Sequence, residues 1–127
     1  MYLLDTSLLI NATNNPDKIS SSIQLILNDS KNSLYISSIS FWEITIKQSI
    51  GKLKLNEPIE KIFNDLNLKG VNIIQIQINH LNVLSKLPHF HKDPFDRLLI
   101  SQAIAENLTI ITSDSKFELY PVKVKLN

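Results

Sequence analysis

The stretch DPFDRLLISQAIAENLTIITSD, residues 93–114, contains the features that decide the fold. Pro94 fits the first position of a helix, and Asp93 before it fits the N-cap. Helical spacing of apolar residues continues from Pro94 to Glu106. The β-branched run 108–112 then predicts a buried strand. Helices that alternate with buried strands are the building units of α/β domains with a parallel sheet.

The same alternation of short apolar runs and longer helical segments extends over the chain. It predicts five strands, at Tyr2–Leu4, Leu34–Ser37, Ile73–Ile76, Leu108–Thr112 and Val122–Val124. It predicts helices at Ile19–Leu27, Ser40–Ile50, Ile59–Leu66, His80–Lys86 and Pro94–Glu106, and the run Leu8-Leu9-Ile10 opens another. No repeat or linker divides the sequence, so we expect a single domain over residues 1–127 with a mostly parallel five-stranded sheet.

Composition narrows the chemistry of the chain. No apolar run is long enough to cross a membrane, and Met1 leads directly to Asp5 without the regions of a signal peptide, so we expect a cytoplasmic protein. The absence of cysteine leaves oxygen and imidazole as metal ligands. The net charge of +1 neither favours nor excludes nucleic acid. With Gly51 and Gly70 as its only glycines, the chain has no glycine-rich phosphate loop.

Asp5 and Asp114 each follow a predicted strand. Asp5 directly precedes Thr6-Ser7 and an apolar helical run, so helix capping and ligand binding at a strand end both explain it. Asp114 lies two residues after a strand, where an Asx-turn is an adequate local explanation.

Glu43 has the capping-box spacing from Ser40, and this is its simplest local explanation. Its neighbours, which include Phe41 and Trp42, leave little polar surface, however. A carboxylate among apolar side chains is costly without a cation or hydrogen-bond donors. Lys47, four residues later, is in position to be its partner.

Asp93 and Asp96 have different expected roles. Asp93 is explained by N-capping, whereas Asp96 shares a helical face with Leu99 and Ala103 and therefore points inward over the sheet. Because the carboxyl ends of parallel strands meet at one edge, we expect Asp96 to lie near the acids that follow strands. The candidate cluster consists of Asp5, Glu43, Asp96 and Asp114.

Clustered carboxylates repel one another unless divalent cations neutralise them. Oxygen ligands favour hard ions, so the cluster predicts Mg²⁺ or Mn²⁺ as its cofactor. A metal site of this kind lowers the pKa of water and offsets the charge that develops on a phosphodiester during in-line attack.

The chain resembles the PIN-domain family, specifically the VapC-like toxins of type II toxin–antitoxin systems. Four segments carry the resemblance, in this order: Leu3-Leu4-Asp5-Thr6-Ser7, Ser40-Phe41-Trp42-Glu43-Ile44, Asp93-Pro94-Phe95-Asp96-Arg97-Leu98-Leu99-Ile100 and Ile111-Thr112-Ser113-Asp114. No single motif is specific, but their combination at this spacing is, and it covers essentially the whole chain.

The resemblance implies a three-layer α/β/α sandwich and a Mg²⁺- or Mn²⁺-dependent endoribonuclease that uses metal-activated water. It implies inhibition by a cognate antitoxin protein and suggests a homodimer. Asp5, Glu43, Asp96 and Asp114 match the acidic quartet of the family. Thr6 and Thr112 match positions where hydroxyls support these carboxylates, and Asp93 is expected beside them.

Several other residues are candidates for contacts with RNA. Lys47, Lys52, Lys54 and Arg97 are expected to form a rim that follows phosphates, although surface lysines are more often merely solvated. His89 and His91 have the spacing of metal ligands, but Pro88 and Pro94 bracket them, which favours a surface loop. His91 and Lys92 are further candidates for phosphate contacts. Trp42 is expected to pack in the core, with antitoxin binding as the alternative.

Two rival functions fit parts of the pattern. A phosphatase or phosphotransferase would use Asp5 as its nucleophile, but the second acid that such enzymes usually carry two residues later is replaced by Ser7. An inactive PIN-like module that only binds a protein is the non-enzyme alternative, and an intact acidic quartet argues against it.

Overall fold

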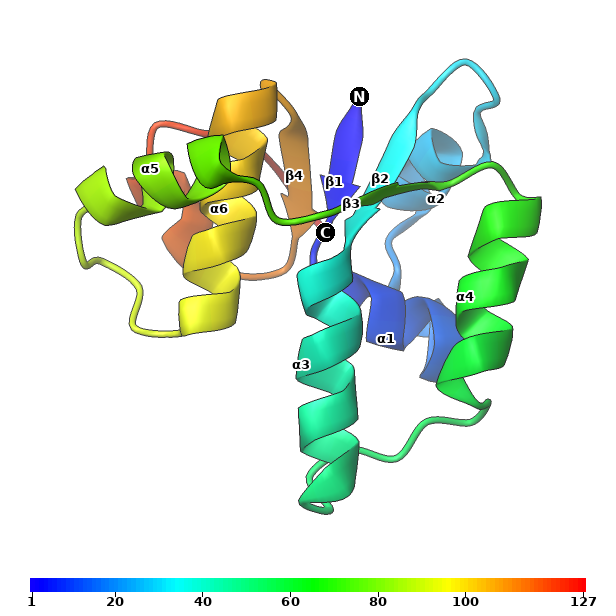
Figure 1. Ribbon diagram of the computed structural model, residues 1–127. Coiled ribbons are helices and arrows are strands. Elements are labelled where there is room, and N and C mark those ends of the chain that lie inside the picture. The colour runs from blue at the N-terminus through cyan, green and yellow to red at the C-terminus, as the bar shows by residue number, and fades with distance from the viewer.

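The computed structural model describes all residues, 1–127, as a parallel sheet enclosed by helices (Figure 1). All four strand pairings are parallel, and the strand order is β3-β2-β1-β4-β5. The strands are β1 (Tyr2–Leu4), β2 (Leu34–Ser37), β3 (Asn72–Ile74), β4 (Thr109–Thr112) and β5 (Lys123–Leu126). The helices are α1 (Thr6–Asn14), α2 (Ser21–Asn28), α3 (Ser38–Ser49), α4 (Ile59–Leu68), α5 (Ile78–Lys86) and α6 (Pro94–Glu106), with short 3-10 helices η1 (Pro16–Lys18) and η2 (Ser115–Leu119).

Two apolar cores cover opposite faces of the sheet. Alternate strand residues point to opposite sides, so Leu3 and Ile110 join one core, whereas Leu4 and Ile111 join the other. Helices α5 and α6 pack on the first face, while α1 to α4 enclose the second (Figure 1). The fold is therefore the expected three-layer α/β/α sandwich.

Helix α6 begins and ends where the sequence predicts, because both ends carry strong local signals. The Asp93 side chain accepts hydrogen bonds from the backbone N–H groups of Phe95 and Asp96. At the other end Asn107 adopts a left-handed conformation with φ 53°. Helix α6 thus holds Asp96 in its first turn, at the end that faces the carboxyl edge of the sheet.

Among the predicted boundaries that the structure corrects, the start of α3 matters for the site. Helix α3 begins at Ser38, with Ser37 as its N-cap, so Glu43 has no capping box with Ser40. Strand β3 ends at Ile74, and Ile76 is exposed beyond it. No helix in the chain combines the length and apolar character that a membrane span requires.

Candidate active site

A pocket of about 180 Å³ opens at the carboxyl edge of the sheet. Its lining includes five carboxylates and one ammonium group, contributed by Asp5, Glu43, Asp93, Asp96, Asp114 and Lys47. Four larger hollows elsewhere, of about 310 to 400 Å³, have one or two carboxylates each, which is an ordinary surface composition. Negative charge is thus concentrated at the edge where β1 and β4 end.

Asp5 is held rigidly at the end of β1. Its Oδ2 accepts a hydrogen bond from Thr112 Oγ1 at 2.7 Å and another from Ser7 Oγ at 3.0 Å. Its side chain makes no capping bond to α1, so helix capping does not explain this residue. Burial raises the pKa of Asp5 despite the hydrogen bonds from Thr112 and Ser7, which act in the opposite direction. A cation in the pocket would stabilise the ionised form.

Glu43 enters the pocket from α3 and is almost fully buried. Its Oε2 pairs with the ammonium of Lys47, the partner expected from the sequence, and this hydrogen bond raises the pKa of Lys47. Its Oε1 is buried without any hydrogen-bond partner. Because an unpaired buried carboxylate oxygen is costly, Glu43 has one ligand position ready for a cation.

Asp96 is the most strongly perturbed acid of the site. Burial is the main cause that raises its pKa to about 8, and the charges of Asp5, Asp93, Glu43 and Asp114 raise it further. Three of these charges, those of Asp5, Glu43 and Asp114, come from elements far apart in sequence. In the absence of a cation, the folded protein therefore retains a proton at Asp96 at neutral pH.

Asp114 lies at the start of η2 and is bonded to His91. Its Oδ1 accepts the backbone N–H of Lys116, so the predicted turn role is present as well. Its Oδ2 lies 2.8 Å from His91 Nε2. Burial acts to raise the pKa of Asp114, but the hydrogen bonds from the Lys116 backbone N–H and the His91 ring hold it below its usual value.

His91 was predicted to lie in a surface loop, and this was wrong. The residue is buried, its backbone N–H donates to Tyr120 Oη, and its Nδ1 accepts the backbone N–H of Asp93. With Nδ1 occupied as an acceptor, the ring proton belongs on Nε2, which lies 3.1 Å from Asp96 Oδ2 as well as next to Asp114. His91 therefore links two of the four acids.

The donor set fits a hard divalent cation. Carboxylate oxygens of Asp96 and Asp114 lie within 4.8 Å of each other, and Asp5 and Glu43 line the same pocket. The partnerless Glu43 Oε1 and the raised pKa of Asp96 both indicate that the carboxylates are under-neutralised without a cation. Oxygen-rich sites of this kind suit Mg²⁺ or Mn²⁺.

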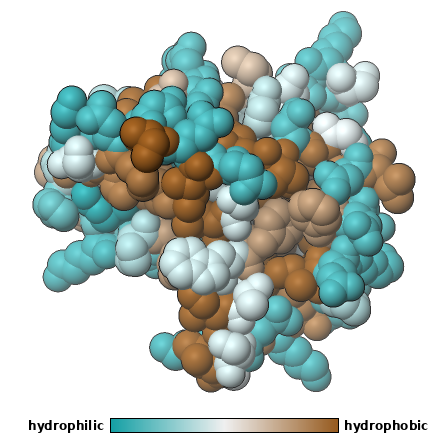
Figure 2. Space-filling view, in the orientation of Figure 1, coloured by the Kyte–Doolittle hydropathy of each residue, from teal (hydrophilic) through white to brown (hydrophobic).

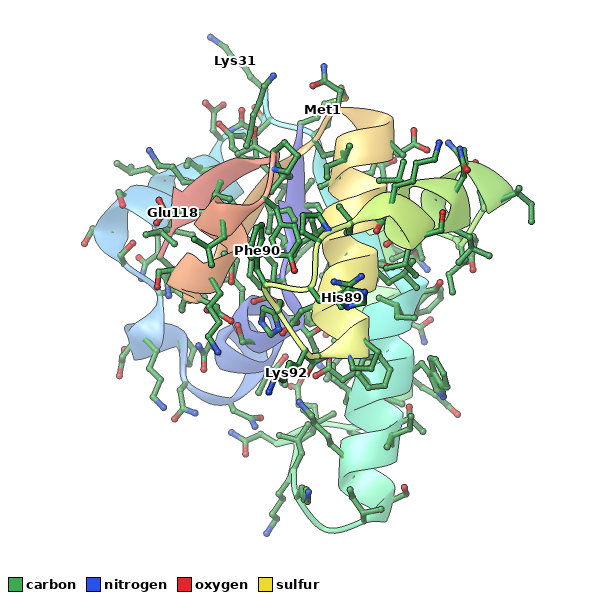
Figure 3. The ribbon with its side chains drawn as sticks, turned by 90° about the vertical axis from the view of Figure 1, so that its left-hand side faces the viewer. Met1, Lys31, His89, Phe90, Lys92 and Glu118 are labelled. Carbon is green, nitrogen blue, oxygen red and sulfur yellow. The ribbon has the colours of Figure 1, made fainter.

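Arg97 does not belong to a phosphate-binding rim, contrary to expectation. Its guanidinium is buried, and it donates to the backbone carbonyls of Pro88 and Leu87. It thus ties the 87–93 loop to α6, and this loop carries His91. Figure 3 shows that this loop also carries His89, Phe90 and Lys92 along the outside of α6.

Three other sequence expectations have different outcomes. Thr112 contacts Asp5 as expected, whereas Thr6 is buried and donates to Ser40 Oγ at 2.8 Å, so it braces α1 against α3. Asp93 lines the pocket but uses its side chain as the N-cap of α6. Trp42 was predicted to be in the core, and this was wrong because its side chain is 57% exposed.

Comparison with known proteins places this geometry in a family. The sequence matches the PIN domain family over residues 2–123. The chain belongs to the PIN-domain family. Comparison with curated protein sequences gives no match.

Solved structures of toxin–antitoxin complexes share this PIN fold. VapBC2 from Rickettsia felis, bound to a promoter DNA fragment, has a chain that is 26% identical with a TM-score of 0.71, over 98% of this chain and 97% of that one. DNA-bound VapBC from Salmonella typhimurium is 16% identical, with a TM-score of 0.70 and coverage of 98% and 96%. A toxin–antitoxin complex from Klebsiella pneumoniae is 19% identical, with a TM-score of 0.65 and coverage of 98% and 96%. The resemblance to VapC-like PIN domains is thereby confirmed.

Proposed function

We propose that this PIN domain is a Mg²⁺- or Mn²⁺-dependent endoribonuclease and the toxin of a toxin–antitoxin pair. The observation that carries the proposal is the convergence of five carboxylates on one pocket, with one buried Glu43 oxygen left without a partner. The similarity to toxin–antitoxin complexes supports a protein antitoxin as the partner. By family analogy, the active form is a cytoplasmic homodimer.

Asp5, Glu43, Asp96 and Asp114 would hold the metal. When bound, a divalent ion lowers the pKa of water and neutralises charge that develops on the phosphodiester. Thr112 and Ser7 fix the orientation of the Asp5 carboxylate, while the Nε2–H of His91 fixes those of Asp96 and Asp114. The chain therefore provides a preorganised set of oxygens and needs little rearrangement at the moment of reaction.

Lysines near the pocket are proposed to hold the RNA backbone. Lys47 lines the pocket itself, and its pairing with Glu43 keeps its ammonium close to the place where a phosphate would lie. Lys52 and Lys54, in the segment after α3, are exposed, as is Lys92 in the loop before α6 (Figure 3). Phosphate contacts of this type position the RNA strand without reading its sequence.

Purified protein, separated from any partner, tests this function directly. We expect cleavage of single-stranded RNA in Mg²⁺ or Mn²⁺, no cleavage in excess chelator, and products with 5′-phosphate ends. A substrate with a 2′-deoxyribose at the scissile position should still be cut, because water would be the nucleophile. Cleavage that persists in chelator, or that leaves 2′,3′-cyclic phosphates, would contradict the proposal.

A further inference from the structure

Trp42 is an exposed aromatic side chain next in sequence to a residue that lines the acidic pocket. It directly precedes Glu43, and its ring packs edge-on against Phe95, which directly precedes Asp96. The ring centroids are 5.3 Å apart and the ring planes meet at 80°. Both neighbouring acids line the pocket. The aromatic pair is thus fixed one residue away from two proposed metal ligands on two different helices.

The core does not explain the position of Trp42. The buried side of α3 is formed by Ile39, Ser40, Glu43 and Ile44, and Trp42 lies off this stripe. Phe95 is partly buried and packs against the core around α6, so it anchors the outer ring. An indole held by a rigid neighbour but left 57% exposed is a preorganised surface for a flat ligand. Figure 2 shows apolar surface on this face of the molecule, over α3 and beside α6.

We infer that Trp42, supported by Phe95, is a stacking platform for a nucleobase next to the phosphate that occupies the acidic pocket. This inference rests on the proposed ribonuclease function and adds a base subsite to it. Stacking of bases on aromatic rings is a general mode of binding for single-stranded nucleic acid and tolerates different sequences. Lys47 on α3 and Lys92 before α6 flank the pair in sequence and would neutralise adjacent phosphates.

A protein segment fits a different surface better. The apolar groove of about 400 Å³ between α3 and α4 is lined by Phe41, Ile59 and Phe63 together with Thr45, Glu60 and Asn64, and Trp42 is not among its residues. Trp42 does not line the acidic pocket either, but it contacts Phe95 of α6, and both aromatic residues directly precede acids that line that pocket. The position of the indole therefore favours a ligand that also occupies the pocket, and a phosphodiester with its base meets that condition.

The chain contains a single tryptophan, so its intrinsic fluorescence reports on Trp42 alone. Titration of the full-length Asp5→Asn variant with a single-stranded RNA octamer in Mg²⁺ should quench this fluorescence in a saturable manner. Inorganic polyphosphate of similar charge has no bases and should produce little quenching at matched concentrations. Equal quenching by the two polyanions, or none by RNA, would overturn the inference.

Variants separate stacking from charge and folding. In the Asp5→Asn background, binding of labelled RNA, measured by anisotropy, should weaken about tenfold in Trp42→Ala and stay within about threefold in Trp42→Phe, which keeps an aromatic ring. Phe63→Ala is the matched control, because Phe63 is also an exposed aromatic paired edge-on, with Phe41. It should bind RNA as tightly as its parent.

Failure of the inference can be distinguished from failure of the ribonuclease proposal. If the wild-type chain cleaves RNA with Mg²⁺ but Trp42→Ala binds and cleaves RNA equally well, the base subsite is wrong and the ribonuclease function remains. The same conclusion follows if Trp42→Ala leaves RNA binding unchanged and abolishes binding of a co-expressed antitoxin. If the wild-type chain cleaves no RNA, the function proposal fails, and saturable base-dependent quenching would still support a nucleobase site at Trp42.

Discussion

Replacing Asp96 by asparagine should stabilise the metal-free protein while removing a proposed metal ligand. The pKa of Asp96 is about 8 in the folded state, against an ordinary value of 3.8, mainly because of burial and then because of the surrounding acids. The folded protein therefore binds a proton that the unfolded chain releases. Stability from this group is complete below about pH 4, decreases as the pH rises, and has been lost once the pH passes about 8.

The size of the effect follows from this difference in pKa. Each pH unit above the ordinary value costs about 1.4 kcal/mol, so the ceiling at pH 7 is roughly 4 kcal/mol. The Asp96 side chain is 19% exposed at the mouth of the pocket, and solvent screening there reduces the cost. We expect Asp96→Asn to raise the free energy of unfolding by about 2 kcal/mol at pH 7 and by less than about 0.5 kcal/mol at pH 4.5.

Urea denaturation in chelator at pH 4.5, 7 and 8.5 measures this dependence. Asparagine retains an oxygen that can accept from His91 Nε2, so the local hydrogen bond is preserved in the variant. Adding Mn²⁺ at pH 7 should stabilise the wild-type protein much more than the variant. The difference in their free energies of unfolding should therefore shrink or change sign. A variant that is less stable than the wild type at pH 8.5 in chelator would contradict the raised pKa of Asp96.

Three further substitutions test separate contacts. Asp93→Ala should lower the free energy of unfolding by about 1 kcal/mol, measured in urea, because α6 loses its N-cap; an unchanged stability would argue against this role. Lys47→Met should destabilise the metal-free protein by about 1 kcal/mol, because Glu43 loses its ammonium partner. Mn²⁺ should restore most of this stability, and destabilisation that Mn²⁺ does not relieve would contradict the prediction. His91→Ala should reduce RNA cleavage by about 10- to 100-fold, and His91→Gln, which keeps a hydrogen-bond donor, should recover part of the activity. If both variants cleave RNA as fast as the wild type, the His91 bridge between Asp96 and Asp114 is not needed.

The elements that the sequence predicted well have their determinants nearby in the chain. The bounds of α6 follow from the Asp93 cap, Pro94 and the apolar spacing that ends at Glu106. The parallel sheet follows from short β-branched runs separated by helices. The meeting of Asp5, Glu43, Asp96 and Asp114 at one pocket follows in turn from the parallel sheet, because such a sheet aligns its carboxyl ends.

The errors concern residues whose environment is set by distant segments. His91 is buried because Tyr120 and Asp114, more than 20 residues later, close over its loop, and no local pattern reports that contact. The sequence held one signal of the buried role of Arg97, which is that it is the only arginine among thirteen basic residues. A guanidinium can satisfy several carbonyls at once, which suits a buried structural role better than a lysine does.

Trp42 shows the limit of reading burial from residue type. Its size and apolar character predict the core, but the buried stripe of α3 consists of residues 39, 40, 43 and 44. The helical position of Trp42 relative to Glu43 was visible in the sequence. The direction of α3 relative to α6 was not, and this direction sets the indole against Phe95 of α6.

The most direct test of the acidic centre is the rate of RNA cleavage in Mn²⁺ by Asp5→Asn and Asp96→Asn, compared with Asp17→Asn, which alters an exposed carboxylate outside the pocket. Circular dichroism of the same samples establishes that all three variants are folded. We expect wild-type rates for Asp17→Asn and loss of cleavage by at least about 100-fold in both pocket variants. Retained cleavage in folded Asp5→Asn and Asp96→Asn would show that the acidic pocket is not the catalytic centre.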